Sequence, residues 1–306
     1  MTMRRSILGL LAALVAFGVT IAPASAGGWS QPYDEYFEKE SFSVSGDYTP
    51  IAGITSCEDG ETGFVLWYAP GSAQDHLWTL SGLGPLEYTS APITVNGDYV
   101  PLAGDFDGDG CDDIFWYAPG AAADYVWWGQ SDGSFTSSST SVNGHYEPFV
   151  GNFTDNRTDD IFWYAPGSGN EYVWDGQPGG SFDSHLAPSV NGQYRPASVY
   201  GTILWHAPGA APDYLWSYAV GSDPDSQQVA INGTYVPLAA PEAILLYAPG
   251  TAPDYAMVDV APFETISATI NGHYTTGVRS PAMSDFMFLW HAPGAATDHL
   301  WSVNAS

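Results

Sequence analysis

The residues best suited to chemistry lie in one acidic loop, "DFDGDGCDD", at residues 105–113. Carboxylates occupy positions 1, 3, 5 and 9 of this loop, and a glycine occupies position 6. Ca²⁺ takes about six to eight oxygen ligands, which alternate residues of a tight loop can supply around a sharp turn at the glycine. The loop therefore predicts a Ca²⁺ site. Its expected ligands are the side chains of Asp105, Asp107, Asp109 and Asp113 and the main-chain carbonyl of Cys111.

The alternative is that this loop is only a solvated acidic turn. That alternative is weak, because four unpaired carboxylates so close together would repel one another. A related loop follows about one repeat later, where oxygen-bearing side chains keep the spacing but an arginine, Arg157, takes the glycine position. It has lost three carboxylates and gained a cation, so we expect weak or no binding there. The aligned residues of this second loop are Asn152, Thr154, Asn156 and Asp160.

The apolar segment after the acidic loop belongs to a unit that occurs six times. An Ala-Pro-Gly turn marks each copy, with its proline at Pro70, Pro119, Pro166, Pro208, Pro249 and Pro293. A second marker pairs a glycine with a tyrosine two residues later, beginning at Gly46, Gly97, Gly144, Gly192, Gly233 and Gly272. Two markers that keep step at a period of roughly 45 residues indicate a propeller or an array of similar units.

Each unit divides into four short strands, and the second strand is apolar on both faces, as in Ile114–Tyr117. Such a strand is typical of a sheet covered on both sides. We therefore predict an all-β fold, a six-bladed β-propeller of four-stranded blades. The last copy stops at Trp301, and Glu38–Val44 resembles a spare outer strand, so an N-terminal strand is expected to close the ring. Two tandem β-trefoils are the main alternative.

The segment "DFDGDGCDD" followed by "IFWY" resembles the FG-GAP and VCBS-type repeats of integrin-α-like propellers. The resemblance implies a β-propeller whose loops of this kind bind calcium structurally. The repeat framework covers nearly all of the chain after residue 26, whereas the full acidic loop occurs once. Two features depart from the family: there is one blade fewer than in integrins, and the turn is Ala-Pro-Gly rather than Gly-Ala-Pro.

The N-terminus has the layout of a secretory signal peptide. Arginines at positions 4 and 5 precede an apolar stretch, and Ala24-Ser25-Ala26 matches a cleavage site. We predict a signal peptide at residues 1–26, a single propeller domain of six repeats at 27–306, and a secreted protein. The two cysteines, Cys57 and Cys111, fall in equivalent loops of adjacent units, so an oxidising compartment favours a disulfide between them.

Charge and composition exclude some classes of partner. The net charge of −28 disfavours nucleic acids and anionic membrane surfaces. Four basic residues remain after residue 26, and no common hydrolase, nucleotide-binding or metalloprotease motif occurs. Catalysis is therefore less favoured than binding.

A second recurring element places an acid and aromatic residues at the start of each third strand. Such groups can bind a sugar, with a ring for stacking and a carboxylate for hydroxyls. The candidate ligand-binding residues are Asp75, Trp78, Asp124, Tyr125, Asp213, Tyr214 and Asp298. The favoured alternative is structural: the tryptophans fill blade interfaces, and the acids cap the Pro-Gly turns. Met257 in place of one tryptophan supports it, because methionine fills space but stacks poorly on sugars.

We interpret the sequence as a secreted, calcium-binding propeller that recognises glycan or protein ligands. One alternative is a polysaccharide-active enzyme with its site at the propeller channel. Another is a structural or adhesive surface protein. The fold class does not choose among these functions.

Overall fold

The computed structural model describes residues 32–55, 57, 62–80, 87–154, 156–199, 201–240, 243–258, 264–279 and 287–303. The predicted signal peptide, residues 1–26, lies outside the described residues. Within those residues, no helix is long and apolar enough to cross a membrane. The single helix there is a short 3-10 helix, η1 (Tyr33–Tyr36), that leads into the first strand.

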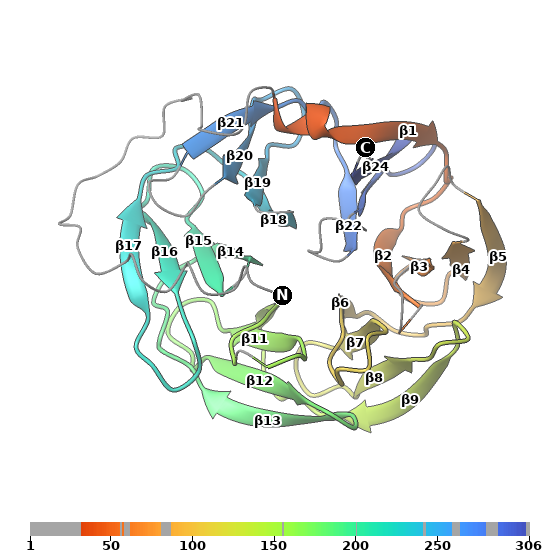
Figure 1. Ribbon diagram of the computed structural model, residues 1–306, viewed down its shortest axis with the longest axis horizontal. Coiled ribbons are helices and arrows are strands. Elements are labelled where there is room, and N and C mark those ends of the chain that lie inside the picture. Colours follow the sequence, from red (N-terminus) through yellow and green to blue (C-terminus); the bar gives the residue numbers. More distant parts are fainter. Residues whose placement is uncertain are drawn as a thin grey trace.

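Six four-stranded antiparallel sheets surround a central axis like the blades of a propeller (Figure 1). Blade 1 contains β2 (Thr49–Ile54), β3 (Gly63–Tyr68), β4 (Asp75–Leu80) and β5 (Tyr88–Ile93). Blade 2 contains β6 (Val100–Gly104), β7 (Asp113–Tyr117), β8 (Asp124–Gly129) and β9 (Phe135–Thr140). Blade 3 contains β10 (Glu147–Gly151), β11 (Asp160–Tyr164), β12 (Tyr172–Gln177) and β13 (Ser181–Leu186).

The remaining blades follow the same plan. Blade 4 contains β14 (Arg195–Val199), β15 (Thr202–His206), β16 (Asp213–Ser217) and β17 (Asp225–Val229). Blade 5 contains β18 (Val236–Ala240), β19 (Ala243–Tyr247), β20 (Asp254–Val258) and β21 (Glu264–Ala268). Blade 6 contains β22 (Thr275–Arg279), β23 (Met287–His291), β24 (Asp298–Val303) and, as its outer strand, β1 (Phe37–Phe42). The predicted six-bladed fold is confirmed, and it excludes the tandem trefoils.

The second strand of each blade forms the core, because neighbouring blades cover both of its faces. In β7 every residue is buried. Trp116 on this strand meets Tyr68 of blade 1 edge to face, with ring centroids 5.2 Å apart. The same contact recurs between Tyr117 and Trp163 at 5.1 Å. Edge-to-face aromatic pairs add stabilisation to the apolar area that they bury, so these rings bind each blade to the next.

The Pro-Gly turn and the glycine-tyrosine marker recur with the same period because they are hydrogen-bonded to each other. Gly71 in the first Pro-Gly turn exchanges backbone hydrogen bonds with Gly97 of the second marker, at 2.8 and 3.1 Å. Gly97 has a φ of 140°, and a Cβ there would lie 2.6 Å from the ring of Tyr99. Glycine is therefore required by both backbone conformation and space. Equivalent glycine bridges join the other blades.

The ring closes through the N-terminal strand, as predicted. β1 pairs with β24 along six residue pairs, from Phe37 with Val303 to Phe42 with Asp298. In Figure 1 β1 lies beside β24 at the outer edge of this blade. The Val44 amide also donates a hydrogen bond to the Asp298 carboxylate, at 2.5 Å. An ion pair between Lys39 and Asp34 at 2.6 Å adds a contact beside the closing strand.

Deleting residues 27–44 should destabilise the propeller strongly. The deletion removes β1, exposes the edge of β24 and uncovers Trp301, which packs on Phe37 with ring centroids 5.9 Å apart. Several kcal/mol of lost stability corresponds to a fall in melting temperature of about 10 °C or more in a domain of this size. Calorimetric melting measures this fall. Deleting residues 27–31 alone is the control. An unchanged melting temperature after the longer deletion would contradict closure by β1.

Candidate metal centre

The acidic loop connects β6 to β7, and its own backbone holds three of its carboxylates. Asp105 accepts hydrogen bonds from the Gly108 and Gly110 amides at 2.8 and 3.0 Å. Asp107 accepts one from the Asp109 amide at 3.2 Å. Asp109 accepts one from the Cys111 amide at 2.8 Å. One carboxylate oxygen from each of Asp105, Asp107 and Asp109 lies within 4.8 Å of the other two. Within the described part of the chain, no other three carboxylates converge in this way.

The loop is electrostatically costly without a cation. Burial raises the pKa of Asp105 to about 6, and the nearby charges of Asp109 and Asp107 add to this rise. Burial also raises the pKa of Asp107, with the Asp109 charge as the second cause. Like charges held together in a partly desolvated site favour protonation or cation binding. The donor set consists of carboxylate oxygens, which hard divalent cations prefer.

Asp113 lies outside the cluster of three. It is fully buried, and its two oxygens accept hydrogen bonds from the Phe106 and Gly129 amides at 2.9 and 2.8 Å. Burial raises its pKa to about 8. Asp160 occupies the same place in blade 3 and likewise accepts from two backbone amides, at 2.6 and 3.1 Å. These contacts give Asp113 a structural role that does not depend on a cation.

The related loop in blade 3 uses hydrogen bonds where the acidic loop has converging charges. The side-chain amide of Asn152 donates to the carbonyls of Asn156 and Thr158, both at 3.1 Å. The side-chain amide of Asn156 in turn donates to Asp175 at 2.8 Å. N–H donors thus bridge the oxygens of this loop. Blade 3 therefore provides an internal comparison for the acidic loop of blade 2.

Both loops also bind their blade to the preceding one. The Asp112 carboxylate accepts a hydrogen bond from the Ile54 amide at 2.8 Å, and the Asp112 amide donates to the Ile54 carbonyl at 2.9 Å. Asp159 makes the same two contacts with Asp105, at 3.0 and 2.7 Å. We call this arrangement the inter-blade clasp. The sequence analysis missed it, because no local pattern distinguishes Asp112 and Asp159 from their acidic neighbours.

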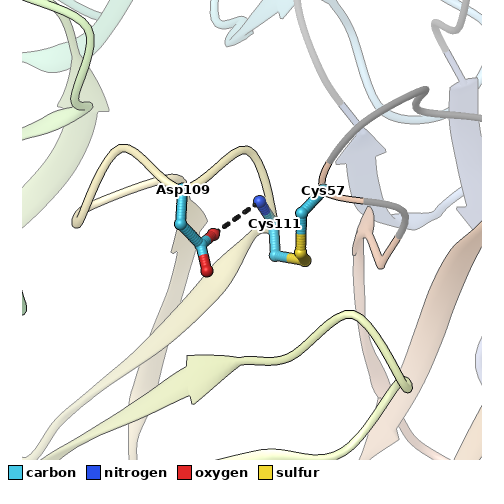
Figure 2. Close-up of side chains that lie close together, drawn as sticks. All are labelled: Cys57, Asp109 and Cys111. Carbon is cyan, nitrogen blue, oxygen red and sulfur yellow. Dashed lines mark hydrogen bonds between the residues drawn. A yellow bond between two sulfur atoms is a disulfide. The ribbon is translucent and has the colours of Figure 1, made fainter.

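The predicted disulfide is confirmed. Cys57 and Cys111 are bonded and join the acidic loop to the equivalent loop of blade 1. Figure 2 shows the bond beside Asp109, whose carboxylate accepts a hydrogen bond from the Cys111 amide at 2.8 Å. Gly110 lies so close to blade 1 that a Cβ would be 2.3 Å from the Cys57 carbonyl oxygen. The acidic loop is therefore held against its neighbour.

The acids at the start of the third strands are buried, and in five of the six blades both carboxylate oxygens accept hydrogen bonds from backbone amides. Asp124 accepts hydrogen bonds from the Ala118 amide beside the Pro-Gly turn, at 2.7 Å, and from the Val142 amide, at 2.6 Å. The carboxylates that make the same paired contacts are those of Asp75, Asp213, Asp254 and Asp298. Glu171 takes this place in blade 3 and is also buried. These acids do not face solvent.

The aromatic residues beside these acids divide into buried and accessible groups. Trp78 is 8% exposed and stacks on Tyr88, with ring centroids 3.8 Å apart. Tyr125 is 36% exposed and packs edge to face on Tyr99 at 6.4 Å. Further pairs of the same kind are Tyr194 with Tyr214, Tyr235 with Tyr255 and Tyr274 with His299. We call the side of the ring that carries these pairs and the Pro-Gly turns the aromatic-pair face.

Tyr99 and Tyr194 were absent from the candidate ligand-binding residues, although the glycine-tyrosine marker contains them both. The antiparallel order of the strands places the acidic loop, between first and second strands, on the face opposite the Pro-Gly turns. The candidate metal centre and the aromatic pairs therefore lie on opposite sides of the ring.

His206 and His291 occupy positions where other blades have a tyrosine, and they make contacts comparable to those of the tyrosine. In blade 2, the Tyr117 hydroxyl donates to the Gly144 carbonyl and accepts from the Tyr146 amide, at 2.8 and 3.0 Å. In blade 4, Nε2 of His206 accepts from the Tyr235 amide at 3.2 Å. Its Nδ1 lies 2.8 Å from the Asp213 carboxylate. His291 repeats the Nδ1 contact with Asp298 at 2.9 Å.

Comparison with known families identifies an FG-GAP repeat at residues 99–134, which spans most of blade 2 and contains the acidic loop. No curated protein matches the chain in sequence. The fold is similar to that of a Penicillium chrysogenum alpha-L-arabinanase complexed with arabinobiose, with a TM-score of 0.54 and 12% identity. That likeness covers 86% of this chain and 98% of the arabinanase.

A second similar structure is AofleA from Arthrobotrys oligospora, with a TM-score of 0.51 and 11% identity over 94% of this chain and 93% of that one. At such low identity these likenesses establish the fold alone.

The metal-free protein should lose stability as pH rises from about 4 to about 8. Burial raises the folded-state pKa of Asp105 to about 6 and that of Asp113 to about 8, from an ordinary value of 3.8. Between these values the folded chain binds more protons than the unfolded chain, so stability falls with increasing pH. Melting in chelator at pH 5 and pH 8 measures the fall.

The variant Asp105→Asn should reduce this fall, because it removes one of the carboxylates with a raised pKa. The matched control is Asp225→Asn, which changes an exposed carboxylate on β17. A melting temperature that rises between pH 5 and pH 8, or an equal effect of the two substitutions, would contradict the role assigned to the acidic loop.

Proposed function

We propose that this chain, an FG-GAP β-propeller, is a secreted, calcium-binding module that recognises glycan or protein ligands. The observation that carries the proposal is the convergence of the Asp105, Asp107 and Asp109 carboxylates within 4.8 Å of one another. Secretion is supported by the signal-peptide pattern at residues 1–26 and by the disulfide, since disulfides persist mainly in oxidising compartments.

The proposed calcium ligands are the side chains of the three converging aspartates, the Cys111 carbonyl and Asp113. The three side chains would bind directly, since backbone amides already hold them together. Asp113 already accepts two backbone hydrogen bonds. Each carboxylate oxygen keeps a second lone pair, and the ligand at loop position 9 often acts through a water molecule. Calcium would supply positive charge to a loop that otherwise holds three carboxylates within 4.8 Å of one another.

Calcium in this position would be structural. The acidic loop lies on the face opposite the aromatic pairs, and it contacts the preceding blade through Asp112 and the following one through Asp159. A cation would therefore stabilise two blade junctions at once. For recognition we propose the aromatic-pair face, where the partly exposed rings of Tyr125 and Tyr214 can stack on a sugar. Repetition around the ring would allow multivalent binding.

Calcium should stabilise the wild-type protein, and Asp109→Ala should abolish most of that effect. Extracellular calcium modules bind at roughly 10⁻⁴ to 10⁻³ M. A hundredfold excess over Kd raises the free energy of unfolding by about 2.7 kcal/mol. Magnesium should substitute poorly, because it requires a tighter octahedron and retains its waters. Calorimetric melting with calcium, magnesium and chelator measures these effects.

The matched control is Asn156→Ala, at the equivalent position of the blade 3 loop. Its calcium-dependent shift should equal that of the wild type. The calcium proposal would be wrong if the wild type shows no shift, or if Asp109→Ala and wild type shift equally.

Recognition should appear as binding without turnover on a glycan array. We expect Tyr125→Ala and Tyr214→Ala each to weaken binding by about tenfold, since loss of an aromatic platform removes roughly 1–2 kcal/mol of contact. Tyr88→Ala is the control, because Tyr88 is 43% exposed but lies at the opposite end of its blade. Release of reducing ends from a polysaccharide would instead favour an enzyme. Equal effects of the three substitutions would reject the aromatic-pair face.

A further inference from the structure

We propose that the Cys57–Cys111 disulfide sets the calcium affinity of the acidic loop, and that bound calcium in return protects this disulfide from reduction. The inference rests on the proposed calcium site. It concerns the disulfide as a positioning element, because neither sulfur atom contributes a ligand to calcium.

The disulfide lies directly beside the proposed ligands. Cys111 supplies the carbonyl of loop position 7, and its amide donates to the Asp109 carboxylate at 2.8 Å. Both sulfur atoms lie within 4.8 Å of an Asp109 carboxylate oxygen. Figure 2 shows the Asp109 side chain beside the disulfide. The bond therefore fixes the residue that both presents one proposed ligand and orients another.

Blade 1 holds the same stretch of loop in two further ways. Asp112 makes both hydrogen bonds of the inter-blade clasp with Ile54, at 2.8 and 2.9 Å. Gly110 packs against the Cys57 carbonyl with no room for a side chain, since a Cβ would be 2.3 Å from that oxygen. The backbone at Gly110 also has a φ of 91°, which favours glycine. The second half of the loop thus lies on blade 1 with the disulfide at its centre.

The first half of the loop is held from the opposite side. The Asp159 carboxylate and amide contact the amide and carbonyl of Asp105 at 3.0 and 2.7 Å. The acidic loop is therefore fixed at both ends by neighbouring blades. The disulfide is the covalent member of this set, and it connects residues 54 positions apart in the sequence. The related loop in blade 3 contains no cysteine.

Because the disulfide pre-organises the acidic loop, it should raise the affinity of that loop for calcium. When the disulfide is absent, residues 109–111 gain freedom that calcium must remove on binding, and ordering a backbone opposes binding. We expect calcium affinity to fall by about tenfold. Coupling between two equilibria is reciprocal. Saturating calcium must therefore shift the disulfide equilibrium toward the oxidised form by the same factor.

The redox step is thiol–disulfide exchange between the protein disulfide and dithiothreitol. Two electrons and two protons pass to the protein disulfide, the bond between the Cys57 and Cys111 sulfurs breaks, and two thiols form. Dithiothreitol is oxidised to its cyclic disulfide. Calcium does not take part in the electron transfer and acts only through its higher affinity for the oxidised loop.

The test has two arms. Titration calorimetry compares calcium binding to the oxidised wild type and to the double variant Cys57→Ser, Cys111→Ser, at a temperature where near-ultraviolet circular dichroism shows both to be folded. A parallel experiment measures the oxidised fraction in dithiothreitol buffers with saturating calcium and with chelator. We expect about tenfold weaker binding in the first arm and a shift of the redox equilibrium by the same factor in the second.

Asp109→Ala, which keeps both cysteines, is the control for the second arm, and calcium should no longer protect its disulfide. Equal calcium affinity of wild type and double variant would overturn the inference, even if the variant melts at a lower temperature, because that result shows a purely structural bond. If the double variant does not fold, the wild-type redox arm decides the question. Absence of calcium binding to oxidised wild type would instead overturn the proposed function, and the inference with it.

Discussion

The second strand of each blade has two apolar faces, and the rest of the structure depends on covering both. A single sheet of this kind cannot be stable in water, and a row of such sheets would leave one apolar face at each end. Joining the row into a ring covers every face, and β1 completes the ring by pairing with β24 (Figure 1). Aromatic rings such as Trp116 and Tyr68 form the contacts between blades. Each repeat therefore contributes an interface with the neighbouring blade as well as strands.

The loops between first and second strands are not part of the doubly covered second strands, so their sequences can differ between blades. The acidic sequence accordingly occurs once. In blade 2 the carboxylates of Asp105, Asp107 and Asp109 converge. In blade 3, the side-chain amide of Asn152 instead donates hydrogen bonds to the carbonyls of Asn156 and Thr158. Both loops retain an acid that binds the preceding blade, Asp112 or Asp159. The two loops therefore differ in their central side chains, whereas both make the same hydrogen-bonded contact with the preceding blade.

The sequence was sufficient for the features that depend on local pattern or on periodicity. The six repeats, the closing strand and the pairing of Cys57 with Cys111 were predicted, since each follows from where the repeats begin and end. For the third-strand acids, a structural role capping the Pro-Gly turns was favoured over sugar binding, and their contacts agree with it. The inter-blade clasp and the pairing of Tyr99 with Tyr125 were missed, because both depend on which atoms face each other across strands, and residue types alone do not determine this.

The most direct test is a crystal structure of the purified protein grown with calcium chloride, with anomalous scattering used to locate the cation. We predict one calcium ion in the acidic loop of blade 2. Its direct oxygen ligands should come from Asp105, Asp107, Asp109 and the Cys111 carbonyl, at the usual distances of about 2.3 to 2.6 Å, and Asp113 should contact it through a water molecule. The equivalent loop of blade 3, between Asn152 and Asp160, should hold no cation. An anomalous peak in the blade 3 loop, or none in the blade 2 loop under saturating calcium, would contradict this assignment.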